Sequence, residues 1–380
     1  MTPELPAGKA PAHGCPSRGV VRWELRAEPW RLSSVRARSC RRAPSWWRLL
    51  TLALVLLAGA AAAKNPPPAS PTNTLVWPAP PDAPRIAYVQ SLGRPADGGA
   101  KVAFFKRIAN WVTGDAAGNE LFIKPFGIAL DEKTNLCLTD TASHTVGYLD
   151  RARKKWRRWD HVGAVRFLSP VAVARRAGIF YVADSALPAV IAFREDGKLL
   201  FQITNRLERP SGLVIAGDRL CVADAERHCL WQYDLRGEPL GQFGERGAGP
   251  GQFNFPTHLG TDAAGRLYVT DSMNSRVQIF DNQGRFQSQI GRLGDSPGHF
   301  SRPKGVAVDS FGHIYVLDAL FDNIQIFDRE GHFLMSLGAS GGGPGEFWLP
   351  NGIAISPGND IFVADAYNRR VQVFKFIGQP

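Results

Sequence analysis

Six aspartates recur at intervals of 40 to 47 residues, and each one ends an apolar run. They are Asp140, Asp184, Asp224, Asp271, Asp318 and Asp365. Carboxylates suit hard cations such as Ca²⁺, but one carboxylate per repeat is too widely dispersed to hold a single ion. An aspartate at a strand end more commonly accepts hydrogen bonds from backbone N–H groups of the adjoining turn. We therefore predict that these residues are structural turn caps.

His258 occupies a position that is glycine in four other repeats, at Gly127, Gly212, Gly305 and Gly352. If the repeats form a ring, this position lies at the start of the innermost strand, near the mouth of the central channel. Polar residues of the equivalent segments that would lie beside it are Ser211, Thr257, Lys304 and Asn351. A histidine, a lysine and an asparagine that converge there would bind an anionic or polar ligand. A solvated channel rim is the alternative.

The remaining histidines do not predict a metal centre. His144, His161, His228, His299, His313 and His332 fall in turns or outer strands. A catalytic zinc site needs three protein ligands at one place, and only one repeat has a histidine at the inner position. We assign no catalytic residue, because no general base with an orienting partner can be named. No cofactor and no metal are expected, although Ca²⁺ or Zn²⁺ would suit a site of this type.

A short basic stretch is interleaved with Trp156 and Trp159. Its cationic residues are Arg151, Arg153, Lys154, Lys155, Arg157 and Arg158. Basic and aromatic residues together suit single-stranded nucleic acid, but this stretch lies in a hairpin. A solvated turn is one interpretation, and a docking patch for an acidic partner or an anionic surface is the other.

The elements that must position these residues are short strands. The proline that opens each repeat recurs at intervals of 40 to 47 residues, at Pro125, Pro170, Pro210, Pro256, Pro303 and Pro350. A period in the forties with strand-like content is typical of a propeller blade. In the fifth repeat we expect four strands, separated by Gly, Asp and Asn, at Gly305–Val308, Ile314–Leu317, Ile324–Phe327 and Phe333–Leu337.

One blade cannot bury both of its faces, so six blades must stack, and a ring leaves no free end. The sixth repeat ends with its third strand, at Val371–Ile377. Residues 86–93 match the fourth strands of other repeats in their apolar order and terminal glycine. The sequence therefore predicts an all-β, six-bladed propeller of four-stranded antiparallel blades, which a strand at 85–93 closes. The six repeats span 121–377 and the propeller 85–380.

The motif P-x-G-[IV]-A-[VL]-D, followed by [LI]-Y-V-x-D and [VI]-Q-[VI]-F, resembles the NHL repeat. The loops 244–253, 291–300 and 338–347 fit the same family as G-x-x-G-x-x-P-G-x-F. The resemblance covers residues 84–377 and is strongest in the last three repeats. The whole chain is most similar to exported bacterial NHL-repeat propellers.

Regular repeats without a convergent catalytic set favour a non-catalytic module that binds a protein or cell-envelope ligand. Similar propellers also include peptidyl-hydroxyglycine lyases and lactonases, so a metal-dependent enzyme of that type, with its site at the channel mouth, is the alternative. Ubiquitin-ligase or RNA-binding roles occur in other NHL proteins, but this chain has no RING, and we expect no nucleic-acid partner. A monomer is expected.

The N-terminal segments indicate export. Residues 49–63 form an apolar run, too short for a membrane span, with arginines before it and an Ala-x-Ala cleavage site at its end. Residues 1–48 have no fold signal and are either a disordered extension or the product of a start codon assigned too far upstream. We predict a periplasmic or secreted protein, or one anchored by an uncleaved signal. The first 63 residues carry a net charge of +7 of the total of +11, so the remainder is only mildly basic.

Two further predictions concern the rest of the chain. Residues 64–84 form a Pro-rich tether, and 101–113 have the apolar periodicity of an amphipathic helix. That helix either packs on one end of the propeller or docks on a membrane surface or a partner, and membrane contact is expected only there or through an uncleaved signal. Cys137, Cys221 and Cys229 do not form a disulfide framework, although a bond between Cys221 and Cys229 stays open.

Overall fold

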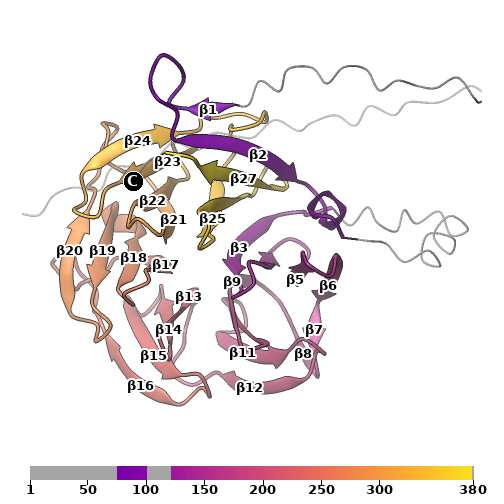
Figure 1. Cartoon of the computed structure of the whole chain (residues 1–380). Coiled ribbons are helices and arrows are strands. Elements are labelled where there is room, and N and C mark those ends of the chain that lie inside the picture. The colour runs from indigo at the N-terminus through magenta and orange to yellow at the C-terminus, as the bar shows by residue number, and fades with distance from the viewer. Residues whose placement is uncertain (1–74, 101–120, 379–380) are drawn as a thin grey trace, which may run out of the picture. The chain divides into compact units, whose positions relative to one another are not determined.

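The computed structural model describes residues 75–100 and 121–378, which form six antiparallel blades around a common centre (Figure 1). The predicted N-terminal extension 1–48, signal segment 49–63 and helix 101–113 lie outside the described residues. Within the described ranges, no helix has the length and apolarity of a membrane span.

Each of the first three blades is a four-stranded meander. Blade 1 contains β3 (Pro125–Leu130), β4 (Leu136–Asp140), β5 (Thr145–Asp150) and β6 (Lys155–Trp159). Blade 2 contains β9 (Pro170–Arg176), β10 (Ile179–Asp184), β11 (Ala189–Arg194) and β12 (Leu199–Ile203). Blade 3 contains β13 (Pro210–Ala216), β14 (Arg219–Asp224), β15 (Cys229–Asp234) and β16 (Pro239–Phe243). A small hairpin of β7 (His161–Val162) and β8 (Val165–Arg166) connects blades 1 and 2.

The remaining blades follow the same plan. Blade 4 contains β17 (Pro256–Thr261), β18 (Leu267–Asp271), β19 (Arg276–Phe280) and β20 (Phe286–Ile290), with the 3-10 turn η2 (Ser272–Asn274) after β18. Blade 5 contains β21 (Pro303–Val308), β22 (Ile314–Asp318), β23 (Asn323–Phe327) and β24 (Phe333–Leu337). The strands of blade 5 lie within two residues of the bounds that the sequence predicts.

Blade 6 is assembled from both ends of the described chain. It contains β25 (Pro350–Ile355), β26 (Asp360–Asp365), β27 (Arg370–Phe376) and β2 (Ile86–Leu92). The register of β2 against β27 places Ile86 opposite Phe376 and Leu92 opposite Val371. The innermost strands of successive blades contact each other, and β25 contacts β3, which completes the ring. An N-terminal strand therefore closes the propeller, as the sequence predicts.

Two small elements flank the closing strand. The short strand β1 (Val76–Trp77), within the segment predicted as a tether, pairs with the outer edge of β2. The 3-10 turn η1 (Pro95–Gly98) follows β2. The Trp77 ring meets Phe374 edge-on at 5.8 Å between ring centroids, so this segment adds an aromatic contact to blade 6.

The apolar core lies between neighbouring blades. The middle strands β4, β18 and β22 are buried along their whole length, as strands covered on both faces must be. The inter-blade loops each bury one phenylalanine, at Phe253, Phe300 and Phe347. Gly338 approaches Phe347 closely at φ +100°, a conformation that favours glycine. This packing gives the inner strands fixed positions around the channel.

Candidate functional site at the channel mouth

The six repeated aspartates join two loops of each blade. The Asp184 carboxylate accepts hydrogen bonds from the backbone N–H groups of Leu168 and Ser169, just before β9, and of Ala186 and Leu187, just after β10. Asp140 and Asp318 accept corresponding sets from both of their loops. Asp224 likewise accepts from Glu208, Arg209 and Arg227. Both loops of a blade therefore lie on the same face of the ring.

Asp271 and Asp365 also bind cationic side chains, of which Arg276 is buried and Arg370 partly buried. The Arg276 Nε lies 2.9 Å from an Asp271 oxygen, and the Arg370 Nε lies 2.8 Å from one of Asp365. Burial raises the pKa of Asp271, whereas hydrogen bonds from Asn254, Asn274 and Arg276 act in the opposite direction. These two carboxylates are hydrogen-bonded groups inside the blades.

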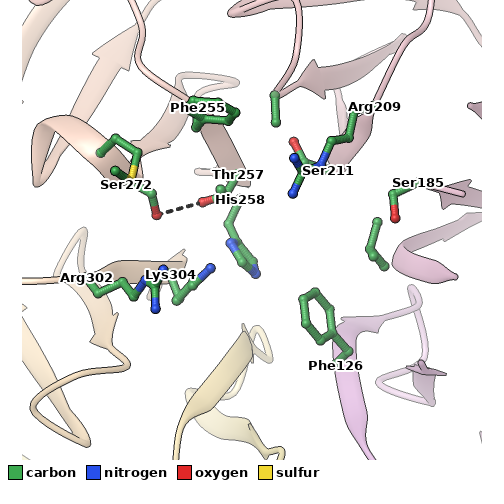
Figure 2. A pocket seen from close by; sticks show the side chains of 13 residues that line it. Phe126, Ser185, Arg209, Ser211, Phe255, Thr257, His258, Ser272, Arg302 and Lys304 are labelled. Carbon is green, nitrogen blue, oxygen red and sulfur yellow. Dashed lines mark hydrogen bonds between the residues drawn. The ribbon is translucent and has the colours of Figure 1, made fainter. Parts of the chain in front are cut away.

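We call the surface formed by the loops before each opening proline and after each repeated aspartate the aspartate-loop face. The channel opens on it in a pocket of about 370 Å³. Figure 2 shows the side chains that converge there from blades 1 to 5. The lining residues are Phe126, Val171, Ser185, Arg209, Ser211, Ala225, Phe255, Thr257, His258, Ser272, Met273, Arg302 and Lys304.

The structure brings four of the five predicted ligand-binding residues, Ser211, Thr257, His258 and Lys304, to this pocket. Two of them already have intramolecular partners. The Ser211 hydroxyl donates to Pro256 O at 2.7 Å, and the Thr257 hydroxyl lies 3.1 Å from that of Ser272. Their hydroxyls therefore connect neighbouring segments of the ring, besides facing the pocket.

The fifth predicted residue, Asn351, is not part of the lining but lies beside the His258 ring. Three atoms of this pair are buried without a hydrogen-bond partner, namely Nδ1 and Nε2 of His258 and Oδ1 of Asn351. Burial, and next the charge of Lys304, lower the pKa of His258 to about 3, while the Asn351 side chain acts in the opposite direction. The imidazole is therefore neutral at physiological pH.

The glycine pattern explains how His258 fits the channel. A Cβ at Gly212 would lie 2.5 Å from Thr257 O, so the equivalent position in most blades has no room for a side chain. In blade 4 the inner strand approaches blade 5 most closely two residues later, at Gly260, where an added Cβ would lie 2.6 Å from Val306 O. His258 keeps its side chain and stacks across the channel on Phe126, with 6.2 Å between ring centroids (Figure 2).

Sequence reasoning missed the two arginines of the pocket, Arg209 and Arg302. Both stand immediately before an opening proline. The residue type at that position differs among the repeats. Aligning the repeats there could have shown that positive charge gathers at the start of several inner strands. Burial, and next the charges of Arg302 and Arg209, lower the pKa of Lys304 to about 8. The three cations are therefore close enough to repel one another.

Comparison with known proteins agrees with this architecture. The NHL repeat family model matches residues 207–233, and a family described as a 6-bladed beta-propeller matches 261–321 and 310–379. These matches agree with the six observed blades. The chain is a six-bladed β-propeller that contains an NHL repeat, and we call it the NHL propeller. No curated protein sequence matches it.

Solved structures share the NHL propeller's fold at low identity. A protein of unknown function from Bacteroides thetaiotaomicron has 14% identity and a TM-score of 0.55, covering 77% of this chain and 75% of that chain. Virginiamycin B lyase from Staphylococcus aureus has 13% identity and a TM-score of 0.51, covering 68% of this chain and 97% of that chain. At such identities the likeness concerns the fold.

The predicted basic patch lies at the outer edge of blade 1 of the NHL propeller, on β6 and the turn before it. Several of its side chains have intramolecular partners. Arg157 pairs with Glu195 at 3.3 Å, Arg153 lies 3.5 Å from Asp150, and the Arg151 guanidinium lies over the Phe362 ring. The patch is thus partly neutralised and does not belong to the channel mouth.

The described residues of the NHL propeller contain neither a disulfide nor a metal-ligand cluster. Cys137, Cys221 and Cys229 are buried free thiols. The β14–β15 register places Cys221 opposite Gln232 and Cys229 opposite Asp224, so the bond between the two cysteines that the sequence left open is not formed. Residues 75–100 and 121–378 contain no group of three or more His, Cys, Asp or Glu that could hold a metal ion.

Proposed function

We propose that this NHL propeller is a non-catalytic binding module that holds a protein ligand on its aspartate-loop face. The observation that carries this proposal is a rim of exposed apolar side chains on the loops of that face. We define the apolar rim as Ile123, Leu168, Met273, Leu320, Trp348 and Tyr367. Each lies within two residues of an opening proline or a repeated aspartate.

Large apolar side chains that gather on one surface favour a protein partner. Trp348 is 54% exposed and Leu320 is 58% exposed, although the aspartates that cap their loops are buried. The Trp348 and Tyr367 rings lie 5.6 Å apart between centroids, and the Lys124 ammonium lies 5.0 Å from the centre of the Tyr367 ring. Tryptophan and tyrosine are the residues that most often dominate binding energy at interfaces.

We further propose that the protein acts outside the cytoplasm, after export directed by the signal segment 49–63. This part of the proposal rests on the sequence pattern alone. A periplasmic or secreted propeller would meet proteins and envelope polymers rather than nucleic acid.

A second candidate is an enzyme with its site at the same mouth. Two observations favour it: His258 has two unpartnered ring nitrogens in the pocket, and a solved propeller of similar fold is a virginiamycin B lyase. A neutral imidazole can accept a proton from a bound substrate. Measured turnover of lactones or of virginiamycin B that disappears in His258→Ala would favour this candidate over the binding module.

The binding proposal is tested by affinity capture from the protein's own cell envelope. The wild-type chain is compared with Trp348→Ser/Tyr367→Ser and with a matched control, Leu240→Ser/Leu334→Ser, which changes exposed residues of the outer strands. We expect the rim variant to lose a stoichiometric partner that both the wild type and the control retain. Equal capture by all three forms would contradict the proposal.

A further inference from the structure

The channel mouth carries more positive than negative charge. Arg209, Arg302 and Lys304 line the pocket, and no aspartate or glutamate is among its lining residues. The charge of Arg209 is partly balanced by Glu226, whose Oε2 lies 3.8 Å from the Arg209 Nη1. Lys304 is half-buried, and its ammonium has no ion pair or hydrogen bond within the part of the chain that the structure describes. Cations held in a concave, partly desolvated site attract an anion strongly, because their field is weakly screened there.

Hydrogen-bonding groups beside these cations also lack partners. A neutral His258 carries one N–H donor, and neither of its ring nitrogens makes a hydrogen bond of good geometry within the described residues, although the Asn351 side chain lies beside the ring. Buried polar atoms are normally paired, so an unpaired ring beside a lysine indicates a place where a ligand atom completes the set. Figure 2 shows His258 and Lys304 side by side in the middle of the pocket, with Phe126 across from them.

The apolar rim favours an acidic polypeptide over a small anion as the ligand. Leu320, Trp348 and Tyr367 are exposed on the same face but do not line the pocket. A small anion that filled the pocket would leave them uncovered, whereas a polypeptide could place an acidic group in the pocket and apolar side chains on the rim. Positive charge in the centre and apolar side chains around it thus complement an acidic segment with aromatic or aliphatic neighbours.

We propose that the aspartate-loop face binds an acidic polypeptide segment. One carboxylate of that segment is held by Lys304, Arg302 and the N–H of His258 in the channel mouth. Neighbouring apolar side chains pack on Leu320, Trp348 and Tyr367. This inference rests on the proposed function and names the chemistry of its partner.

The test is selection of peptides from a random display library on the full chain in four forms. They are the wild type, the pocket variant Lys304→Met/Arg302→Met, the rim variant Trp348→Ser/Tyr367→Ser, and the control Lys198→Met/Arg236→Met. The control removes the same charge from two exposed turns away from the aspartate-loop face. Melting curves establish that each form is folded, and Arg302→Met alone, a change at an exposed position, serves if the double variant does not fold.

We expect wild type and control to select peptides that combine Asp or Glu with aromatic or aliphatic residues. The pocket variant should lose the acidic preference, and a selected peptide should bind it about 30-fold or more weakly than it binds the wild type. Binding to the wild type should also weaken as NaCl is raised from 50 to 300 mM.

Rim-dependent peptides without acidic enrichment would overturn this inference and leave the proposed function standing. Peptides that are indifferent to the rim variant, or no peptides at all, would count against the proposed function as well. Binding of citrate or inorganic phosphate as tight as that of the peptides, unaffected by the rim variant, would show a small-anion site and overturn the inference.

Discussion

At the scale of single residues, the polar side chains of this ring differ in whether the protein itself supplies their hydrogen-bond partners. The repeated aspartates accept several hydrogen bonds each from loop N–H groups or arginines, which fits a capping role. The ring nitrogens of His258 and the Oδ1 atom of Asn351 show the opposite pattern, because they are buried at the channel without partners. Unpaired groups thus separate the candidate site from the capping residues.

Replacing Asp271 by alanine should destabilise the fold strongly. Arg276 is buried and its guanidinium would lose its carboxylate partner, which typically costs about 3–5 kcal/mol. Asp295→Ala, at an exposed loop position, is the control and should change the free energy of unfolding by about 0.5 kcal/mol or less. Urea denaturation of both variants measures the difference, and equal effects would contradict the assigned role of Asp271.

His258 should make stability depend on acid pH. Its pKa falls from 6.5 to about 3 on folding, through burial and the nearby Lys304 charge, with Asn351 and Phe126 as its other neighbours. Between these values the unfolded chain binds a proton that the folded chain does not, so stability decreases as the pH is lowered through this range. The melting temperature of the wild type should therefore fall more from pH 7 to pH 4 than that of His258→Gln. Parallel pH profiles would show that the ring is accessible to protons.

At the scale of elements, the closing strand β2 replaces the fourth strand that the sixth repeat lacks. Ile86 and Leu92 are buried against β27, whereas Val89, at a bulge in the pairing, is 51% exposed. This alternation supplies a matched set of substitutions within one strand.

Ile86→Lys and Leu92→Lys should each lower the melting temperature sharply, because a charge would be buried without a partner in blade 6. Val89→Lys should leave it nearly unchanged. Deletion of residues 82–95 should have the largest effect, since it reopens the ring. Circular dichroism melts compare the four variants, and a deletion mutant that melts like the wild type would rule out closure by β2.

At the scale of the whole molecule, the repeats predicted the architecture and only part of the site. The opening prolines and repeated aspartates keep one period, so the number of blades, the strand bounds and the closing strand follow from the sequence. Arg209 and Arg302 do not follow from that period, because the position before the opening proline is basic in some blades and polar or apolar in others. The direction of their side chains depends on how neighbouring inner strands pack.

Export is the prediction that concerns the complete chain. If residues 49–63 are a cleaved signal, the protein recovered from the cell envelope should begin after Ala63. Intact mass spectrometry of the natural product measures this. A measured mass that includes residues 49–63 would support the anchored form. Recovery of the protein from the cytoplasm would contradict export.

The pairing of β2 with β27 has a consequence for how the molecule is made. Synthesis runs from the N-terminus, so β2 leaves the ribosome almost 300 residues before β27, the strand with which it pairs along its length. During that interval β2 and the growing stack of blades both present bare hydrogen-bonding edges, which invite association with other chains. Completion of the disc must wait for the final residues, so a chaperone that shields nascent strands should raise the yield of this protein more than that of a propeller whose blades are each continuous in sequence.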